Sequence, residues 1–116
     1  MMRQWEIWKY PFGEEIGDHW VVILSNDERC GKDRITHVNG LICTTLRPAG
    51  RELSASEVVL NGTEGFDRKT VVRCDVIYLI AKAQMFDRIG AVASTVRRKQ
   101  IARAMAAGFR LPNPWS

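Results

Sequence analysis

The chain has 116 residues, a net charge of +4 and 46% hydrophobic residues, which suits one small domain with a single core. Its three cysteines are far apart and form no C-x-x-C pair, so we expect reduced thiols, and two histidines argue against a histidine-rich metal centre. No apolar run has the length of a signal peptide or a membrane span. We therefore expect a cytoplasmic protein without membrane contact, bound metal or cofactor, whose basic charge suits a polyanion without requiring one.

The first half of the chain predicts short strands separated by polar turns. Four segments of apolar, β-branched or alternating residues predict strands: residues 5–10, 20–24, 41–46 and 57–60. Pro, Gly and Asn residues bound these segments and predict turns between them. The third strand could begin near Ile35, with Asn39-Gly40 as a bulge or turn. Residues 26–34 are polar and predict a turn.

Residues 70–80 form the longest stretch of β-branched and aromatic residues without Gly or Pro, and they predict one central strand. Because side chains alternate along a strand, Arg73 and Asp75 would share one face, with Cα atoms about 7 Å apart. Cys74 would face the core. A guanidinium beside a carboxylate could hold a phosphate and move a proton. The plainer interpretation is a surface ion pair, worth about 0–1 kcal/mol.

The last part of the chain predicts one long helix. Residues 81–88 predict a turn or a single helical turn, and residues 90–93 a brief extended piece. Ser94 is a good N-cap for a helix over residues 95–107, which Gly108 would end. Its predicted buried stripe is Val96, Ile101, Ala104, Met105 and Phe109, with Arg97, Arg98, Lys99 and Arg103 facing water. Residues 1–111 would form one domain and residues 112–116 a Pro-rich tail. Short strands followed by one helix predict a compact, mainly β, mostly antiparallel barrel with a C-terminal helix.

Several motifs in the same order resemble the MazF/PemK/Kid family of toxin endoribonucleases from toxin–antitoxin pairs. The sequence at 6–8 (EIW) is similar to the family's opening strand, residues 21–25 to its second strand, and Thr44-Thr45 to the end of its third. Residues 71–75 reproduce its V-V-R-C-D motif letter for letter. The resemblance spans roughly residues 5–109. It implies a small SH3-like barrel of the CcdB/MazF kind, a homodimer, single-stranded RNA as substrate, and a small antitoxin that occupies the RNA groove.

Three residues are candidates for catalysis in such an enzyme. RNA is cut without metal when the 2′-hydroxyl attacks the neighbouring phosphate, which requires a base, an acid and positive charge on the phosphate oxygens. Asp75 is the candidate base, and the planar fork of Arg73 the candidate phosphate clamp. Where the family usually has Arg-Pro at the start of the second strand, this chain has His19-Trp20. His19 is a natural proton donor at neutral pH and could replace the missing arginine in a different role.

Three further residues are candidates for substrate contacts. The hydroxyls of Thr44 and Thr45 could donate hydrogen bonds to phosphates or base edges. Glu14 lies in the acidic first loop, where some family members carry a histidine, although such a residue is more often only solvated.

Two other functions stay open at this point. One is a non-catalytic SH3-like barrel that binds RNA or a protein and has lost its cleavage activity with the Arg-Pro pair. The other is a gyrase inhibitor of the CcdB type, which depends on a C-terminal tryptophan; Trp115 lies in the Pro-rich tail instead of at a helix end.

Overall fold

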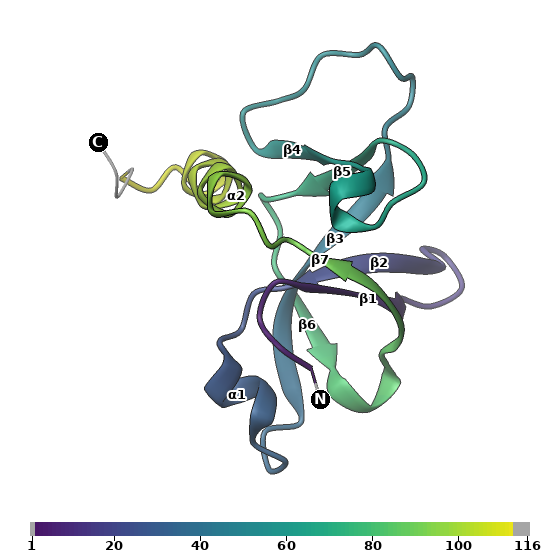
Figure 1. The fold of residues 1–116 in the computed structure, drawn as a ribbon, viewed down its shortest axis with the longest axis vertical. Helices are drawn as coiled ribbons and strands as arrows, with labels where there is room; N and C mark the ends of the chain where they lie inside the picture. The colour runs from purple at the N-terminus through teal and green to yellow at the C-terminus, as the bar shows by residue number, and fades with distance from the viewer. Residues whose placement is uncertain (1, 113–116) are drawn as a thin grey trace.

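The computed structural model describes residues 2–112, in which seven strands form one antiparallel sheet and one long helix packs beside it (Figure 1). The strands are β1 (Glu6–Pro11), β2 (Asp18–Ile23), β3 (His37–Thr45), β4 (Glu57–Leu60), β5 (Thr70–Arg73), β6 (Tyr78–Ala81) and β7 (Phe86–Ala91). The helices are α1 (Asp27–Gly31) and α2 (Thr95–Gly108), with 3-10 turns η1 (Gly62–Glu64) and η2 (Lys82–Gln84). The prediction of a mainly β fold with a C-terminal helix is confirmed.

The nine-residue strand β3 is the centre of the sheet. The strand order is β4-β5-β3-β2-β1-β7, and β6 also pairs with β3. On the side away from β2, the end of β3 pairs with β5 over residues 43–45, while its start pairs with β6 over residues 37–40. β3 thus begins at His37 and runs through Asn39-Gly40 as regular strand, without the bulge or turn that the sequence suggested.

The prediction of one unbroken strand over residues 70–80 is wrong. Val72 pairs with Cys43 and Tyr78 pairs with Gly40, so residues 73–77 lie opposite only Leu41 and Ile42. A regular ladder pairs residues one to one, so five residues cannot pair with two, and the extra residues bulge out where β5 gives way to β6. We call residues 73–77, which begin with the last residue of β5, the bulge. The residues on both sides of the bulge have the apolar, β-branched pattern of one continuous strand. That pattern does not reveal how many residues of β3 lie opposite them, so the break could not be predicted.

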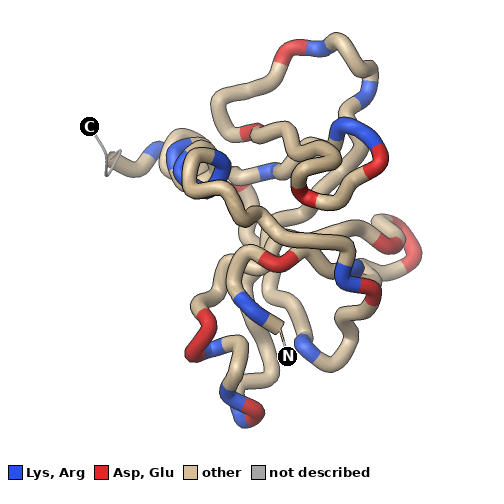
Figure 2. The backbone as a smooth tube through the Cα atoms, viewed as in Figure 1, with Lys and Arg blue, Asp and Glu red and all other residues tan. Residues whose placement is uncertain are grey.

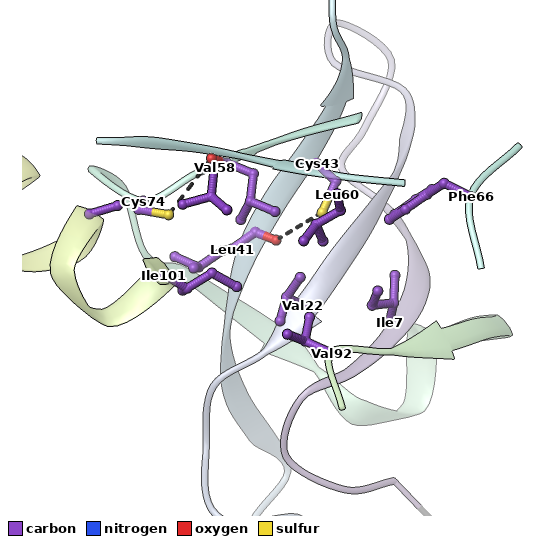
Figure 3. Packing of buried hydrophobic residues seen from close by; sticks show 12 residues of the cluster. Ile7, Val22, Leu41, Cys43, Val58, Leu60, Phe66, Cys74, Val92 and Ile101 are labelled. Carbon is purple, nitrogen blue, oxygen red and sulfur yellow. Dashed lines mark hydrogen bonds between the residues drawn. The ribbon is translucent and has the colours of Figure 1, made fainter. Parts of the chain in front are cut away.

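Hydrophobic side chains pack on both faces of the sheet. On the face covered by α2, the core includes Val22, Leu41, Val58 and Leu60, and Ile101 reaches it from α2 (Figure 3). On the other face, Val21, Ile23, Val38 and Ile80 form a second buried cluster with aromatic residues of β1. The continuous apolar run in β2 is therefore buried on both faces, as predicted.

Helix α2 begins where the sequence predicts, since the Ser94 side chain accepts a hydrogen bond from the Arg97 N–H. Its predicted buried stripe is only partly correct. Ile101 and Ala104 are buried and Met105 packs against the core, but the side chains of Val96 and Phe109 are 68% and 41% exposed. The helix contacts the sheet chiefly at β4. This contact buries a narrower stripe of the helix than the periodicity of its apolar residues suggests.

Two arginines of α2 make contacts that the sequence did not predict. Arg97 forms an ion pair with the buried carboxylate of Glu64 in η1 (Nε–Oε2, 3.7 Å). Arg98 donates from Nε to the Val92 carbonyl oxygen (2.7 Å) and lies over the ring of Trp5. Neither therefore simply faces water. Both contacts hold the first turns of α2 against the barrel.

Other boundaries differ in smaller ways. The polar segment 26–34 contains the helix α1, capped by the Asn26 side chain, instead of only a turn. Helix α2 continues through Gly108. β7 starts at Phe86, earlier than the extended piece predicted over residues 90–93. The tail predicted over residues 112–116, including Trp115, lies outside the described residues except for Pro112. No helix within residues 2–112 combines the length and apolar character needed to cross a membrane.

Gly90 in β7 tests the packing of η1 against the barrel. A methyl group added there would overlap the carbonyl oxygen of Glu64, whereas one added at Gly50 would meet no atom within 4 Å. We expect Gly90→Ala to lower the free energy of unfolding by about 1–3 kcal/mol. Gly50→Ala should change it by less than about 0.5 kcal/mol. Urea unfolding of both variants measures this, and equal midpoints would contradict the packing.

Candidate active site

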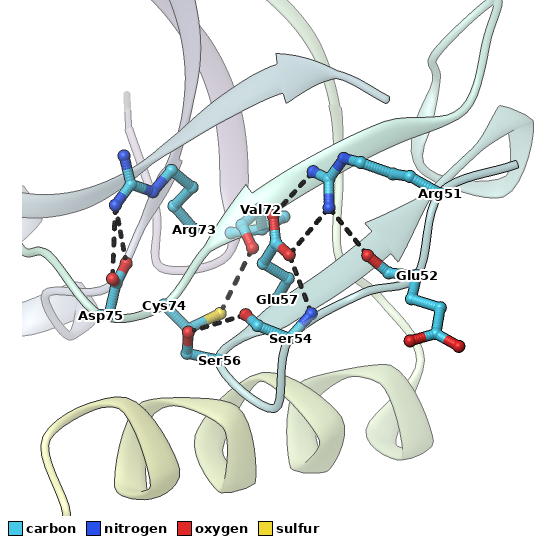
Figure 4. A network of polar contacts seen from close by, with 9 residues as sticks. All are labelled: Arg51, Glu52, Ser54, Ser56, Glu57, Val72, Arg73, Cys74 and Asp75. Carbon is cyan, nitrogen blue, oxygen red and sulfur yellow. Dashed lines mark hydrogen bonds and ion pairs between the residues drawn. The ribbon is translucent and has the colours of Figure 1, made fainter. Parts of the chain in front are cut away.

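The ion pair of Arg73 and Asp75 lies at the beginning of the bulge, on the surface. Arg73 Nη2 is 3.4 Å from Asp75 Oδ1 and 3.3 Å from Oδ2 (Figure 4). The two side chains are 47% and 35% exposed, so the pair contributes about 0–1 kcal/mol. Both contacts use a single nitrogen, and within residues 2–112 Nε and Nη1 of Arg73 have no hydrogen-bond partner. A guanidinium held this loosely can turn its remaining donors to an incoming phosphate.

The bulge is held in place from the side opposite to this ion pair. Cys74 is fully buried, and its N–H donates to the Ser56 carbonyl oxygen (2.9 Å). Burial raises the pKa of the Cys74 thiol to about 12, so it stays neutral and belongs to the core, as predicted. The end of α2 braces Asp75, because a Cβ at Gly108 would lie 2.9 Å from the Asp75 Cα. Because it has no side chain, Gly108 therefore lets the end of α2 lie close to the bulge.

Strand register places His19, Thr44 and Arg73 on one face of the sheet. Trp20 pairs with Cys43, so His19 and Thr44 follow on adjacent strands with their side chains on the opposite face. Thr44 pairs with Val71, two residues before Arg73, which keeps Arg73 on that face. Two strand spacings and two residues separate His19 from Arg73, a Cα distance of about 12 Å. Both long side chains can reach one phosphate group from such a distance.

The histidine ring has a defined orientation. His19 Nε2 lies 3.0 Å from the Ile16 carbonyl oxygen. Because a carbonyl only accepts, Nε2 carries a proton, and Nδ1 is the nitrogen left to exchange one. The ring packs against Phe12 in an edge-to-face contact, with centroids 6.2 Å apart.

Thr45 points to the other face and lines a cavity of about 550 Å³ at the end of the barrel. Trp20 and Phe66 form its aromatic walls and pack edge-to-face against each other, with centroids 6.4 Å apart, and Lys9 Nζ lies 4.9 Å from the Trp20 ring centre. His19 and Thr44 also border this cavity. The sequence did not predict this cavity lining. Lys9 meets Trp20 only because β1 pairs with β2, and Phe66 meets it only through the course of the loop after η1.

Glu14 is exposed in the turn between β1 and β2, which the Gly17 N–H closes onto the Gly13 carbonyl oxygen. Figure 2 shows acidic residues around this turn and basic residues along α2. The helix carries four basic residues, Arg97, Arg98, Lys99 and Arg103, and no acidic one.

A second ion pair lies next to the first and was not found from the sequence. Arg51 donates from Nη1 to Glu57 Oε1 (3.0 Å) and from Nη2 to Glu57 Oε2 (2.8 Å) (Figure 4). The Ser54 N–H also donates to Glu57 Oε1 (2.9 Å). The hydrogen bonds from Arg51, and then the one from Ser54, lower the pKa of Glu57 to about 2. Glu57 pairs with Arg73 across β4 and β5, so the two ion pairs are neighbours.

A family model of PemK-like, MazF-like toxins of type II toxin–antitoxin systems matches residues 3–109. The chain belongs to this family. The match covers nearly the whole domain and ends at the C-terminal cap of α2, so the strands, the bulge and the helix all lie within it. It gives no support to the CcdB-like alternative.

Solved structures share the fold. A mycobacterial endoribonuclease in complex with its cognate antitoxin superposes with a TM-score of 0.80 at 21% identity, covering 98% of this chain and 100% of that one. Another mycobacterial endoribonuclease gives 0.77 at 19%, covering 97% and 95%. The Mycobacterium tuberculosis toxin MazF-mt6 gives 0.75 at 22%, covering 92% and 98%. These likenesses confirm the predicted MazF-like small barrel. A search of curated proteins finds no significant match.

The Arg51–Glu57 pair predicts how stability depends on pH. A carboxylate with a lowered pKa stabilises the fold above its unfolded pKa of about 4.5, and this contribution is lost as pH falls towards 2. We expect the melting temperature to fall less steeply below about pH 4.5 in Glu57→Gln than in the wild type. Circular dichroism melts across that range measure this.

Glu52→Gln is the matched control, since it removes a neighbouring exposed carboxylate whose side chain accepts no hydrogen bond from any of residues 2–112. It should follow the wild-type slope. Identical slopes for Glu57→Gln and the wild type would show that the pair does not stabilise the fold.

Proposed function

We propose that this chain is the toxin of a type II toxin–antitoxin pair and cuts single-stranded RNA without a metal. The observation that carries the proposal is the bulge, which presents Arg73 and Asp75 on the face that also holds His19 and Thr44. Membership of the PemK/MazF-like toxin family supports it, as do the two similar structures described as endoribonucleases.

The reaction is an internal transesterification. The 2′-hydroxyl oxygen forms a bond to the adjacent phosphorus, and Asp75 removes its proton. Arg73 binds the non-bridging oxygens and stabilises the charge that builds on the phosphorane. The bond from phosphorus to the 5′-oxygen then breaks, and the protonated His19 ring supplies a proton to that leaving oxygen. The products are a 2′,3′-cyclic phosphate and a 5′-hydroxyl end.

The neighbouring groups bind the rest of the strand. Thr44 donates its hydroxyl beside the scissile phosphate, and Thr45 does so within the cavity. The aromatic walls of the cavity, Trp20 and Phe66, suit the flat faces of a base. Glu14 stays a prediction for a substrate contact at the β1–β2 turn. The basic side of α2 adds attraction for the RNA backbone that is independent of sequence.

The proposed assembly is a cytoplasmic homodimer that a cognate antitoxin inhibits. One of the similar structures is a complex with its cognate antitoxin, which supports such a partner here. Exposed apolar side chains along the bulge, β6 and β7 offer surface for these contacts: Ile77, Leu79 and Phe86 are 42%, 68% and 37% exposed.

A second candidate is a barrel that binds RNA without cutting it. The replacement of the family's Arg-Pro by His19-Trp20 favours this alternative, since it removes one cation from the proposed reaction face, which holds His19, Thr44 and Arg73. Gel-shift binding of an RNA that stays intact would identify it.

The test is cleavage of a labelled mixed-sequence single-stranded RNA in excess EDTA. We expect the wild type to cut, and Arg73→Ala and Asp75→Ala each to lower the rate by about 10²–10³-fold or more. His19→Ala should lose about 10²-fold. Because the Arg73–Asp75 pair is exposed, Arg73→Ala and Asp75→Ala should each stay within about 1 kcal/mol of the wild-type free energy of unfolding.

Arg34→Ala is the matched control, because this exposed arginine follows α1, outside the proposed site. It should cut at the wild-type rate. A wild type that leaves the RNA intact, or an Arg73→Ala variant that cuts normally, would reject the proposed chemistry.

A further inference from the structure

Arg73 has a second carboxylate within reach besides Asp75. Glu57 of β4 and Arg73 of β5 are directly paired across the two strands, so their side chains lie on the same face. Directly opposite residues in antiparallel strands have Cβ atoms about 4.5–5.5 Å apart, and opposite charges there attract each other. Arg73 nevertheless makes its ion pair with Asp75 and not with Glu57.

Glu57 does not pair with Arg73 because its oxygens are already bound. Oε1 accepts from Arg51 Nη1 and from the Ser54 N–H, and Oε2 accepts from Arg51 Nη2. This two-point contact fits the planar guanidinium and is stronger than a single-point ion pair. Its side chains are only 31% and 16% exposed, against 47% and 35% for Arg73 and Asp75. The tighter and more buried pair thus holds Glu57 away from the looser one (Figure 4).

Arg51 is itself fixed by its own loop, the segment between β3 and β4. Its N–H donates to the Pro48 carbonyl oxygen (3.1 Å), and Nη1 also donates to the Glu52 carbonyl oxygen (3.1 Å). The guanidinium therefore reaches Glu57 from a loop that contributes no other group to the proposed reaction.

We propose that Arg51 is a positioning residue for RNA cleavage: by binding Glu57 on both oxygens, it leaves Arg73 available for the phosphate. This inference rests on the proposed function. With Arg51 in place, the charges of Arg51, Glu57, Arg73 and Asp75 sum to zero. Without it, two carboxylates would flank Arg73, and the local charge of −1 would both occupy its donors and repel RNA.

The test is a double-mutant cycle on Arg51 and Glu57. Arg51→Ala should slow cleavage of single-stranded RNA about three- to tenfold, and it should weaken binding of the same oligonucleotide with a 2′-deoxy residue at the cleavage site by a similar factor. Arg51→Ala combined with Glu57→Gln should return both values to within about twofold of the wild type, because the competing charge is gone. Arg51→Lys should fall between Arg51→Ala and the wild type, since an ammonium cannot bind both oxygens.

The rescue separates positioning from other roles of Arg51. If the double variant stays as slow as Arg51→Ala, then Arg51 contacts RNA directly or only shapes its loop, and the inference is wrong. Unchanged cleavage and binding in Arg51→Ala would overturn it as well.

An observation that needs no RNA keeps this test distinct from that of the proposed function. The side-chain Nε–H resonance of Arg73 in a ¹⁵N-labelled protein should shift in Arg51→Ala and return in the double variant. If the resonance behaves so while the wild type leaves RNA intact, the proposed function fails and the competition for Arg73 stands. A resonance that does not respond to Arg51→Ala would refute the competition whatever the wild type does to RNA.

Discussion

The structure depends on a mismatch between the number of residues in β3 and the number in the chain segment that lies along one side of it. β5 and β6 both pair with β3 on that side, and the five residues between the paired Val72 and Tyr78 lie opposite only two residues of β3. The resulting bulge is not loose chain. Its second residue, Cys74, is buried on the α2 side and donates its N–H to the Ser56 carbonyl oxygen, and Gly108 lets the end of the helix touch Asp75. Core packing thus fixes the position of two charged residues that themselves contribute little stability.

The bulge shapes the strand motif that carries the proposed reaction site. Here register brings Arg73 to the face of His19 and Thr44, and the bulge places Asp75 beside its guanidinium. In the neighbouring pair, Arg51 neutralises Glu57, so that Glu57 does not act as a second carboxylate partner of Arg73. Rigid elements carry the proposed reacting groups, while the exposed ion pair can open when a phosphate arrives.

Local patterns in the sequence predicted what depends on local interactions. The strand over residues 57–60, the Ser94 cap of α2, the buried β2 and Cys74 all follow from periodicity or capping chemistry. The bulge could not be predicted, because it arises from the pairing of β3 with two distant strands. The same holds for the Arg97–Glu64 and Arg51–Glu57 pairs and for the cavity behind Trp20, which all join segments that only the fold brings together. Arg73 and Asp75 came from the V-V-R-C-D motif, and the face that Arg73 shares with His19 and Thr44 came from register.

Chemical-shift mapping with a 2′-deoxy-substituted single-stranded oligonucleotide tests the central claim most directly. The backbone and side-chain resonances of a ¹⁵N-labelled wild type would be followed as the uncleavable strand is added. If the bulge and the adjoining strands form the reaction face, the largest changes will fall on His19, Thr44 and residues 71–75. Changes confined to α2 or to the β1–β2 turn, with the bulge unaffected, would contradict this account.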